Sequence, residues 1–310
     1  MGARARRRYY ANRPHLQHRL SRPVISIGNL AAGGRAKTPL AALVATRLRD
    51  MGERPAILSR GYGRRDRRDG VVVVRDPDGI RADLDRAGDE PLMLARRLDG
   101  VSVLVCSSRY LAGRLAEHHF GSTVHVLDDG FQHFDLHRDA DLVVIAASDV
   151  ENPVTLPSGQ LREPIDAATA ADAFVALGAD VRVGGCDRPT WIAHKRVAPA
   201  NVSGPLLAVA GVADPLAFFR DARQAGWSIA RELAFRDHHP YSADDVRRIE
   251  DEARAAGTAT VLTTEKDYVR LLPFRPFGVS IVVAPLTLEL EGIDTFDAWL
   301  RARVDAARRS

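Results

Sequence analysis

The first 180 residues alternate between short apolar runs and segments in which apolar residues recur every three or four positions. The short runs predict strands, and the segments of helical spacing predict helices. The predicted strands are 24–27, 56–59, 71–74, 101–106, 123–127, 141–146 and 173–177. The predicted helices are 39–50, 91–98 and 109–120. Strands that alternate with helices in this way indicate an α/β fold built on a doubly wound parallel sheet.

A second series of elements follows residue 205. It contains predicted strands at 206–210, 260–263 and 279–283, and predicted helices at 215–225 and 242–256. Ser242 and Asp245 give the last helix a start that resembles a capping box. Residues 147–170 have the composition of a loop. We therefore predict a basic N-terminal arm at 1–22, a core domain at 23–200 and a smaller α/β domain at 201–310.

Composition excludes several classes of protein. Hydrophobic residues make up 45% of the 310 residues and charged residues 27%, which are values typical of a globular domain and not of a disordered or collagen-like chain. The only two cysteines, Cys106 and Cys186, exclude a disulfide scaffold and favour a reducing compartment. No apolar run is long enough for a transmembrane helix, and no secretory signal follows the basic start.

The first 22 residues are locally extreme, because they contain seven arginines and no acidic residue. One interpretation is a disordered arm. Another is a peripheral anchor on an anionic membrane surface, to which each nearby basic side chain contributes about 1 kcal/mol. The chain contains neither a zinc motif nor an aromatic and basic RNA-binding signature, so we do not expect nucleic acid as a partner. No obligate protein partner is evident.

A glycine-rich segment between the first strand and the first helix is the strongest chemical signal. Residues 28–38 read GNLAAGGRAKT. Backbone N–H groups in such a loop, together with the N-terminus of the following helix, bind phosphate. Lys37 is expected to neutralise phosphate charge and Thr38 to bind Mg²⁺. The candidate nucleotide-binding residues of this loop are Gly33, Gly34, Arg35, Ala36, Lys37 and Thr38.

Four further segments carry candidate chemistry, although each is weak by itself. Asp128 and Asp129 end an apolar strand, as the Mg²⁺-binding carboxylates of phosphate-transferring enzymes do. Asp89 precedes a helix and is either a base or an N-cap. Arg162 and Glu163 place a cation beside a carboxylate, and residues 237–240 place two imidazoles beside an acid.

Taken together, these motifs resemble the tetraacyldisaccharide 4′-kinase family of lipid A biosynthesis. The motifs occur in order along the chain as GN, GG and KTP within 28–39, SRGYG at 59–63, GDEP at 88–91, DDGFQH at 128–133, LREP at 161–164, DHH at 237–239 and TEKD at 264–267. The resemblance implies a P-loop kinase core and a smaller α/β domain that closes the cleft. It also implies ATP- and Mg²⁺-dependent transfer of the γ-phosphate to the 4′-hydroxyl of tetraacyldisaccharide 1-phosphate.

The resemblance also implies roles for individual residues. Asp89 matches the proposed catalytic base, paired with His238, and Lys37 and Asp129 complete the catalytic set. Arg162 joins the loop residues in binding the nucleotide. Thr38, Asp128, Asp129 and Glu163 match the residues around Mg²⁺. Substrate contacts are expected at Ser59, Arg60, Gly61 and Tyr62.

Two departures from the family pattern modify these expectations. Ala36 stands where the family has glycine, so its Cβ is expected to crowd the phosphate or to oppose a positive φ. Arg35 stands where a small residue is usual and would add charge to the phosphate site. The apolar membrane helix of the family is replaced by the arginine-rich arm, which predicts peripheral attachment to the cytoplasmic face of the inner membrane. The alternatives are a catalytically weak relative that binds nucleotide or lipid, and a P-loop kinase for a soluble acceptor.

Overall fold

The computed structural model describes residues 3–61, 63–66 and 70–309. The chain forms two units, the first containing Met1–His194 with Leu288–Ser310 and the second containing Lys195–Thr287. The chain leaves the first unit within β9 (Thr190–Val197) and returns to it within β14 (Leu286–Leu290). The predicted domain at 201–310 is therefore too long at its C-terminal end, because residues after 287 belong to the first unit.

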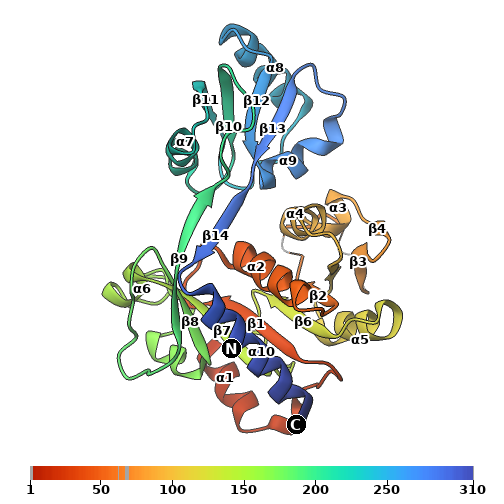
Figure 1. Cartoon of the computed structure of the whole chain (residues 1–310), viewed down its shortest axis with the longest axis vertical. Coiled ribbons are helices and arrows are strands. Elements are labelled where there is room, and N and C mark those ends of the chain that lie inside the picture. Colours follow the sequence, from red (N-terminus) through yellow and green to blue (C-terminus); the bar gives the residue numbers. More distant parts are fainter. Residues whose placement is uncertain (1–2, 62, 67–69, 310) are drawn as a thin grey trace. The chain divides into compact units, whose positions relative to one another are not determined.

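The first unit is built on a ten-stranded sheet (Figure 1) with the order β14-β9-β8-β7-β1-β6-β2-β5-β3-β4. All neighbours from β9 to β5 pair in parallel, whereas β3 is antiparallel to β5 and to β4. The remaining strands are β1 (Val24–Asn29), β2 (Pro55–Ser59), β3 (Val72–Asp76), β4 (Gly79–Ile80), β5 (Ser102–Val105), β6 (Val124–Asp128), β7 (Ala140–Ala146) and β8 (Ala173–Leu177). The predicted α/β fold with a parallel sheet is confirmed.

Helices cover both faces of this sheet. Helix α2 (Lys37–Asp50) packs on β1, β2 and β6 and also contacts α4 (Asp89–Arg97). Alternate residues of β2, Ala56 and Leu58, instead join the cluster that packs against α5 (Arg109–Phe120). The shorter helices of this unit are α3 (Leu84–Ala87), α6 (Ala147–Glu151), η1 (Pro14–Leu16) and η2 (Ile165–Ala170). Segment 147–170, which was predicted to be a loop, therefore contains α6 and η2.

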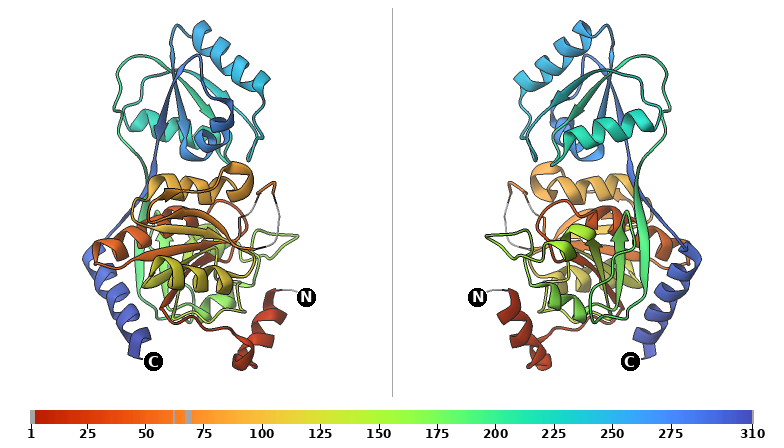
Figure 2. Two further views of the ribbon diagram at one scale, coloured as in Figure 1. Left: turned by 90° about the vertical axis from the view of Figure 1, so that its right-hand side faces the viewer. Right: turned by 90° about the vertical axis from the view of Figure 1, so that its left-hand side faces the viewer.

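The last helix, α10 (Ile293–Arg309), completes the first unit, and Figure 2 shows it beside this sheet. Phe296, Leu300 and Val304 recur every four residues and are buried. The ring of Phe296 meets Trp191 of β9 edge to face, with centroids 5.1 Å apart. This contact explains why the C-terminal residues pack on the first unit.

The basic N-terminal arm is ordered where the structure describes it. Residues Ala3–Ala11 form helix α1. The Arg7 guanidinium stacks on the rings of Phe131 and Phe134, at 4.4 and 4.9 Å from the centroids. Cation–π contacts of this kind stabilise a partly desolvated arginine. The arm is therefore tied to the first unit by packing as well as by charge.

The second unit is a four-stranded parallel sheet with the order β11-β10-β12-β13. Its strands are β10 (Leu206–Ala210), β11 (Ile229–Ala234), β12 (Thr260–Thr264) and β13 (Ser280–Ala284), and its helices are α7 (Pro215–Gln224), α8 (Ala243–Ala255), α9 (Glu265–Leu271) and η3 (Leu272–Phe274). The predicted capping box of α8 is present, because Ser242 and Asp245 each accept a hydrogen bond from the backbone N–H of the other. In the part of the chain that the structure describes, no helix has the length and apolarity needed to cross a membrane.

Candidate active site

The glycine-rich segment 28–38, which the sequence predicts to be a phosphate-binding loop, lies between a strand and a helix. It follows β1, and Lys37 and Thr38 lie in the first turn of α2. Ala36 is the N-cap residue of this helix and adopts a left-handed conformation, with φ 54° and ψ 25°. The first backbone N–H groups of a helix have no partner within the helix and are available to bind an anion. The geometry of this loop is therefore compatible with the predicted binding of phosphate.

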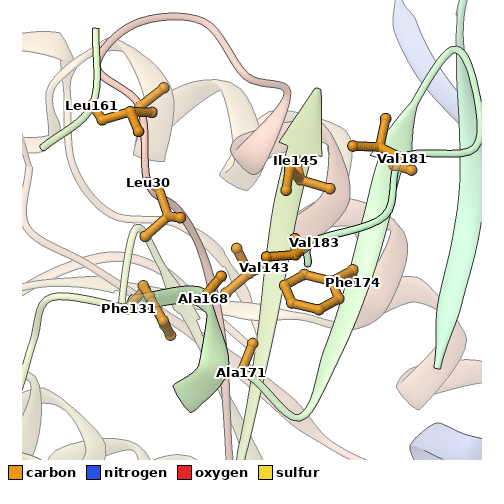
Figure 3. Close-up of a cluster of buried hydrophobic side chains, with 12 residues drawn as sticks. Leu30, Phe131, Val143, Ile145, Leu161, Ala168, Ala171, Phe174, Val181 and Val183 are labelled. Carbon is orange, nitrogen blue, oxygen red and sulfur yellow. The ribbon is translucent and has the colours of Figure 1, made fainter. Parts of the chain in front are cut away.

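One hydrophobic cluster holds three loops of the site in place, as Figure 3 shows. Leu30 begins the phosphate-binding loop, Phe131 follows the acidic pair at the end of β6, and Leu161 precedes Arg162. All three side chains are at most 2% exposed. Because they share one core, the three loops converge at the carboxyl ends of adjacent strands, where α/β proteins bind ligands.

Backbone contacts tighten this arrangement. The N–H of Ala32 donates to the carbonyl of Gln160 at 2.7 Å, and the N–H of Arg162 donates to the carbonyl of Leu30 at 2.6 Å. A Cβ atom at Gly28 would lie 2.3 Å from Cβ of Phe131, so only glycine permits this approach of β1 to the acidic loop. The phosphate-binding loop is thus held by backbone hydrogen bonds and by close packing.

Lys37, Arg162 and Asp129 form the charged centre of the site. The Lys37 ammonium lies 3.1 Å from Oδ1 of Asn29 and 3.3 Å from Oδ1 of Asp129. Arg162 donates to Oδ2 of Asp129 at 2.9 Å. Burial opposes ionisation of Asp129, but Lys37 and Arg162 outweigh it and hold the pKa of this carboxyl below its ordinary value. Asp129 therefore stays negative and orients two cations.

Thr38 and Asp128 provide two hard oxygen donors close together. The Thr38 hydroxyl donates to Oδ2 of Asp128 at 3.4 Å, and both residues are buried. Within residues 3–61, 63–66 and 70–309, no three His, Cys, Asp or Glu side chains gather as a metal site. Mg²⁺ in phosphate-transferring enzymes usually takes one or two protein oxygens and fills its shell with phosphate and water. The Thr38 and Asp128 pair fits that pattern.

Glu163 has a different environment from the other acids of the site. It is fully buried, and its two carboxylate oxygens accept hydrogen bonds from Nε and one terminal nitrogen of Arg7 at 3.0 and 2.9 Å. Gln132 also donates to Glu163 at 3.1 Å and to the carbonyl of Asn29 at 2.9 Å. Glu163 therefore connects the N-terminal helix to the end of β1.

The guanidinium of Arg35 is hydrogen-bonded to side chains of the protein. It donates to Oδ1 of Asp149 at 2.6 Å, to Ser148 at 3.1 Å and to Gln160 at 3.1 Å. The Asp149 side chain is only 2% exposed. The contacts link the phosphate-binding loop to α6 and to the loop that carries Arg162. They give Arg35 a structural role in holding the loop.

Three non-glycine residues have a positive φ among those that the structure describes: Ala36 at 54°, Asp129 at 57° and His238 at 53°. All three are candidate site residues from the sequence. Such a conformation is unfavourable for residues other than glycine and persists only where the surroundings impose it. The three residues with this infrequent backbone conformation thus all lie within the sequence motifs.

Asp89 begins α4 and is buried at 7% exposure. Its Oδ1 accepts a hydrogen bond from the N–H of Glu90 at 2.9 Å. Of the predicted substrate residues, Ser59 ends β2 and is buried, Arg60 is exposed, and Gly61 has a φ of 71°. Tyr62 lies outside the described residues.

Arg109 and His133 belong to this region but were not selected from the sequence. Arg109 is 4% exposed, and its Nε has no hydrogen-bond partner among the described residues. Burial, reinforced by the Arg60 cation, lowers the pKa of Arg109, although Asp129, Asp135 and Asp128 act in the opposite direction. Burial likewise lowers the pKa of His133. A buried cation among acids can bind an incoming anion, but a lone arginine at a helix start carries no sequence signal.

His238 belongs to the second unit and lies in the loop between β11 and α8. The N–H group of His238 donates to Oδ1 of Asp237 at 2.9 Å. Its Nδ1 lies 3.1 Å from a terminal nitrogen of Arg270. Arg270 was not selected from the sequence, because it lies outside the TEKD motif.

Comparison with known proteins identifies the family. The family profile described as tetraacyldisaccharide-1-P 4′-kinase matches residues 1–305. The chain belongs to this family. The predicted resemblance is therefore confirmed.

Individual relatives agree with the family match. The chain is 38% identical over 272 residues to the tetraacyldisaccharide 4′-kinase of Geobacter metallireducens, covering 82% of this chain and 80% of the relative. It is 39% identical over 303 residues to the enzyme of the same name from a Bradyrhizobium species, covering 93% and 85%. A crystal structure of LpxK from Aquifex aeolicus in complex with ATP superposes with a TM-score of 0.78 at 28% identity, covering 96% of this chain and 93% of that one.

Proposed function

We propose that the chain transfers the γ-phosphate of ATP to the 4′-hydroxyl of tetraacyldisaccharide 1-phosphate, a step of lipid A biosynthesis. The observation that carries the proposal is the placement of Lys37 and Thr38 at the N-terminus of α2, facing the acidic pair at the end of β6. Membership of the 4′-kinase family supports the choice of acceptor. The ATP complex of LpxK from Aquifex aeolicus supports the choice of donor.

The roles of the loop residues follow from electrostatics. Phosphoryl transfer needs positioning and charge neutralisation more than covalent chemistry. Gly33, Gly34, Arg35 and Ala36 supply the loop that lies against the phosphates, and Lys37 and Arg162 supply two cations that Asp129 holds in position. Arg109 is a third cation, buried and electrostatically coupled to the acidic pair. It is suited to stabilise charge on the transferred phosphoryl group.

Thr38 and Asp128 would hold Mg²⁺, with Asp129 nearby. The ion would supply neutralisation of the phosphate oxygens. Glu163 fits a supporting role better than a ligand role, because Arg7 already engages both of its oxygens. In this proposal, Glu163 fixes Gln132 and thereby the end of β1.

Asp89 is the proposed base that removes the proton from the acceptor hydroxyl. A sugar hydroxyl is a weak nucleophile, and a carboxylate within hydrogen-bond reach assists its attack. The pairing of Asp89 with His238 stays a prediction, which a double-mutant cycle of the two positions tests. Ser59, Arg60 and Gly61 are the proposed contacts of the disaccharide.

The N-terminal arm supports a proposal of peripheral attachment to the cytoplasmic face of the inner membrane. Arg6, Arg8 and Arg13 are exposed, and so are Tyr9 and Leu16, at 39% and 40%. Basic side chains and exposed apolar groups together favour binding to anionic lipid.

Flotation with vesicles tests this attachment. The full chain is expected to float with phosphatidylglycerol vesicles at low salt and to dissociate from them as the salt concentration rises. It is not expected to bind neutral phosphatidylcholine vesicles. A variant in which Arg6, Arg8 and Arg13 are replaced by glutamine should lose the binding. Equal flotation with neutral vesicles would contradict the electrostatic attachment.

The kinase proposal is tested by transfer of label from γ-³²P-ATP to purified tetraacyldisaccharide 1-phosphate in detergent with Mg²⁺. Glucosamine is tested in parallel as a soluble acceptor. Label on the lipid alone supports the proposal. Label on the soluble sugar alone would indicate a kinase for a soluble acceptor, and ATP binding without transfer would indicate a catalytically weak relative.

The role of Asp89 is tested in the same assay. Asp89→Asn keeps the size and the hydrogen bond from the N–H of Glu90 but removes the base, so kcat is expected to fall by at least about 10²-fold with little change in KM. A change in KM alone would assign Asp89 to substrate binding. The alternative role as an N-cap is wrong, because Gly88 is the N-cap of α4 and Asp89 is its first helical residue.

A further inference from the structure

The second unit contains a buried polar cluster at the ends of β10 and β12. At its centre is Asp267, which is fully buried in α9. Oδ2 of Asp267 accepts hydrogen bonds from the N–H of Gly211 at 2.9 Å and from the Thr264 hydroxyl at 2.7 Å. Oδ1 accepts from the Tyr241 hydroxyl and from Arg270, each at 3.1 Å. Four donors fill the capacity of one carboxylate.

Arg270 connects this cluster to His238. The arginine is 7% exposed and one turn after Asp267 on α9. One terminal nitrogen, Nη1, donates to the carbonyl of Gly211 at 2.9 Å and to Asp267. The other, Nη2, lies 3.1 Å from Nδ1 of His238. The guanidinium is thus held by Asp267 and Gly211 in the orientation that reaches the imidazole.

Arg270 dictates the proton arrangement of the imidazole. An arginine is always protonated and can only donate, so Nδ1 of His238 must accept. The proton of the neutral ring then lies on Nε2. The backbone of His238 is held at a φ of 53°, in the left-handed region that residues other than glycine adopt infrequently. Ring and backbone are therefore both constrained.

We propose that Arg270, held by Asp267, is a positioning residue that fixes His238 as the neutral Nε2–H tautomer, so that His238 serves as a hydrogen-bond donor. The inference rests on the proposed function, in which His238 takes part in phosphoryl transfer. It explains why the TEKD motif accompanies the DHH motif along the chain: Thr264 and Asp267 orient Arg270, and Arg270 orients His238.

The test variant is Arg270→Lys, because it keeps the cation that buried Asp267 needs. A single ammonium cannot hydrogen-bond Gly211, Asp267 and His238 in the way that the planar guanidinium does. We expect kcat to fall on the order of tenfold, the low end of the loss when an orienting partner is removed, with KM for ATP unchanged. Arg254→Lys, at an exposed arginine of α8, is the matched control.

The imidazole ¹⁵N signals report the tautomer directly. The protein is labelled at its ten histidines, and His238→Ala assigns the signal of His238. The wild type is expected to show the Nε2–H pattern, and Arg270→Lys a mixture of both tautomers. A wild-type signal from the Nδ1–H tautomer, or an unchanged pattern in Arg270→Lys, would overturn the inference.

A double-mutant cycle separates positioning from general structure. If Arg270 acts through His238, Arg270→Lys has no further effect on kcat in the His238→Ala background. Additive losses would show a merely structural role and overturn the inference alone. If His238→Ala keeps wild-type kcat, the role of His238 in the proposed function fails, and the inference fails with it.

Discussion

The loops around Lys37 and the loop around His238 are held by different means. The first share the apolar core of Leu30, Phe131 and Leu161, and the buried ion pair of Arg7 with Glu163 adds to it. The second is fixed by a buried carboxylate and an arginine. Apolar packing is spread over many contacts, whereas a polar cluster depends on each of its members, since a lost partner leaves a buried group unsatisfied. Single polar substitutions should therefore disturb the His238 region more than the packing that holds the loops around Lys37.

The largest effect is expected where charge meets the reacting phosphate. Lys37→Ala removes a cation that Asp129 and Asn29 hold in place, and kcat should fall about 10²–10³-fold. Lys195→Ala, at an exposed lysine of β9, is the control and should keep wild-type kcat. An unchanged kcat in Lys37→Ala would remove the basis for placing the nucleotide at this loop.

The close packing of β1 against the acidic loop is tested at Gly28. Gly28→Ala places a Cβ 2.3 Å from Cβ of Phe131, so the acidic loop must move and the free energy of unfolding should fall by about 1–3 kcal/mol. Gly34→Ala lies in the same segment, but its Cβ would meet nothing within 4 Å. Urea denaturation should show a loss only for Gly28→Ala. Equal stability of the two variants would show that the loops are not held by close packing.

The contact between the N-terminal helix and the site is tested at Arg7. Arg7→Ala leaves the fully buried Glu163 without its cation, and the free energy of unfolding should fall by about 2–3 kcal/mol. Arg8→Ala, at the exposed neighbour, should change stability by less than about 0.5 kcal/mol. Thermal denaturation of both variants measures the difference. Similar losses of stability in the two variants would contradict a stabilising role of the ion pair between Arg7 and Glu163.

The buried polar cluster around Asp267 should make the stability of the protein depend on pH in the alkaline range. Burial and the nearby Asp267 raise the pKa of Tyr241 far above 10. The unfolded chain loses this proton above pH 10 while the folded chain keeps it, so stability falls as pH rises above 10. The slope of this single group approaches about 1.4 kcal/mol per pH unit. Above pH 10, the free energy of unfolding of Tyr241→Phe should therefore fall less steeply with pH than that of the wild type. Identical slopes in the two proteins would show that the Tyr241 hydroxyl is solvated in the folded protein.

The smallest effect is expected at Ala36. Its φ of 54° costs an alanine about 1 kcal/mol relative to glycine, part of which is offset by the greater freedom of glycine in the unfolded chain. Ala36→Gly should therefore raise stability by less than about 1 kcal/mol and change kcat by less than about threefold. A large gain in kcat would mean that the alanine impairs phosphate binding.

Strands and helices with a clear local pattern of apolar residues could be predicted from the sequence. Elements that depend on packing against a distant part of the chain were missed. Residues 109–120 and 206–210 were predicted with the bounds that the structure has. Helix α10 was missed despite the spacing of Phe296, Leu300 and Val304, and β9 was missed because exposed polar residues interrupt its apolar positions.

Candidate site residues divide in the same way. Lys37, Thr38, Asp128 and Asp129 were selected because a strand followed by a turn or helix is visible in sequence, and the structure brings them together. The pair of Arg7 and Glu163 joins residues 156 positions apart, and no local pattern records it. Arg35 was expected near phosphate, but its partner Asp149 is also remote in sequence. Motifs reveal residue types and spacing, whereas long-range partners need the fold.

The most direct test of the account is to identify the atom that receives phosphate. The lipid product of wild-type protein, ATP and Mg²⁺ is isolated and examined by ³¹P and ¹H NMR. A second phosphate monoester is expected, whose phosphorus couples to the proton on the 4′-carbon of the disaccharide. A phosphate at any other position, or a lipid recovered unchanged while ATP is bound, would contradict the proposed transfer to the 4′-hydroxyl.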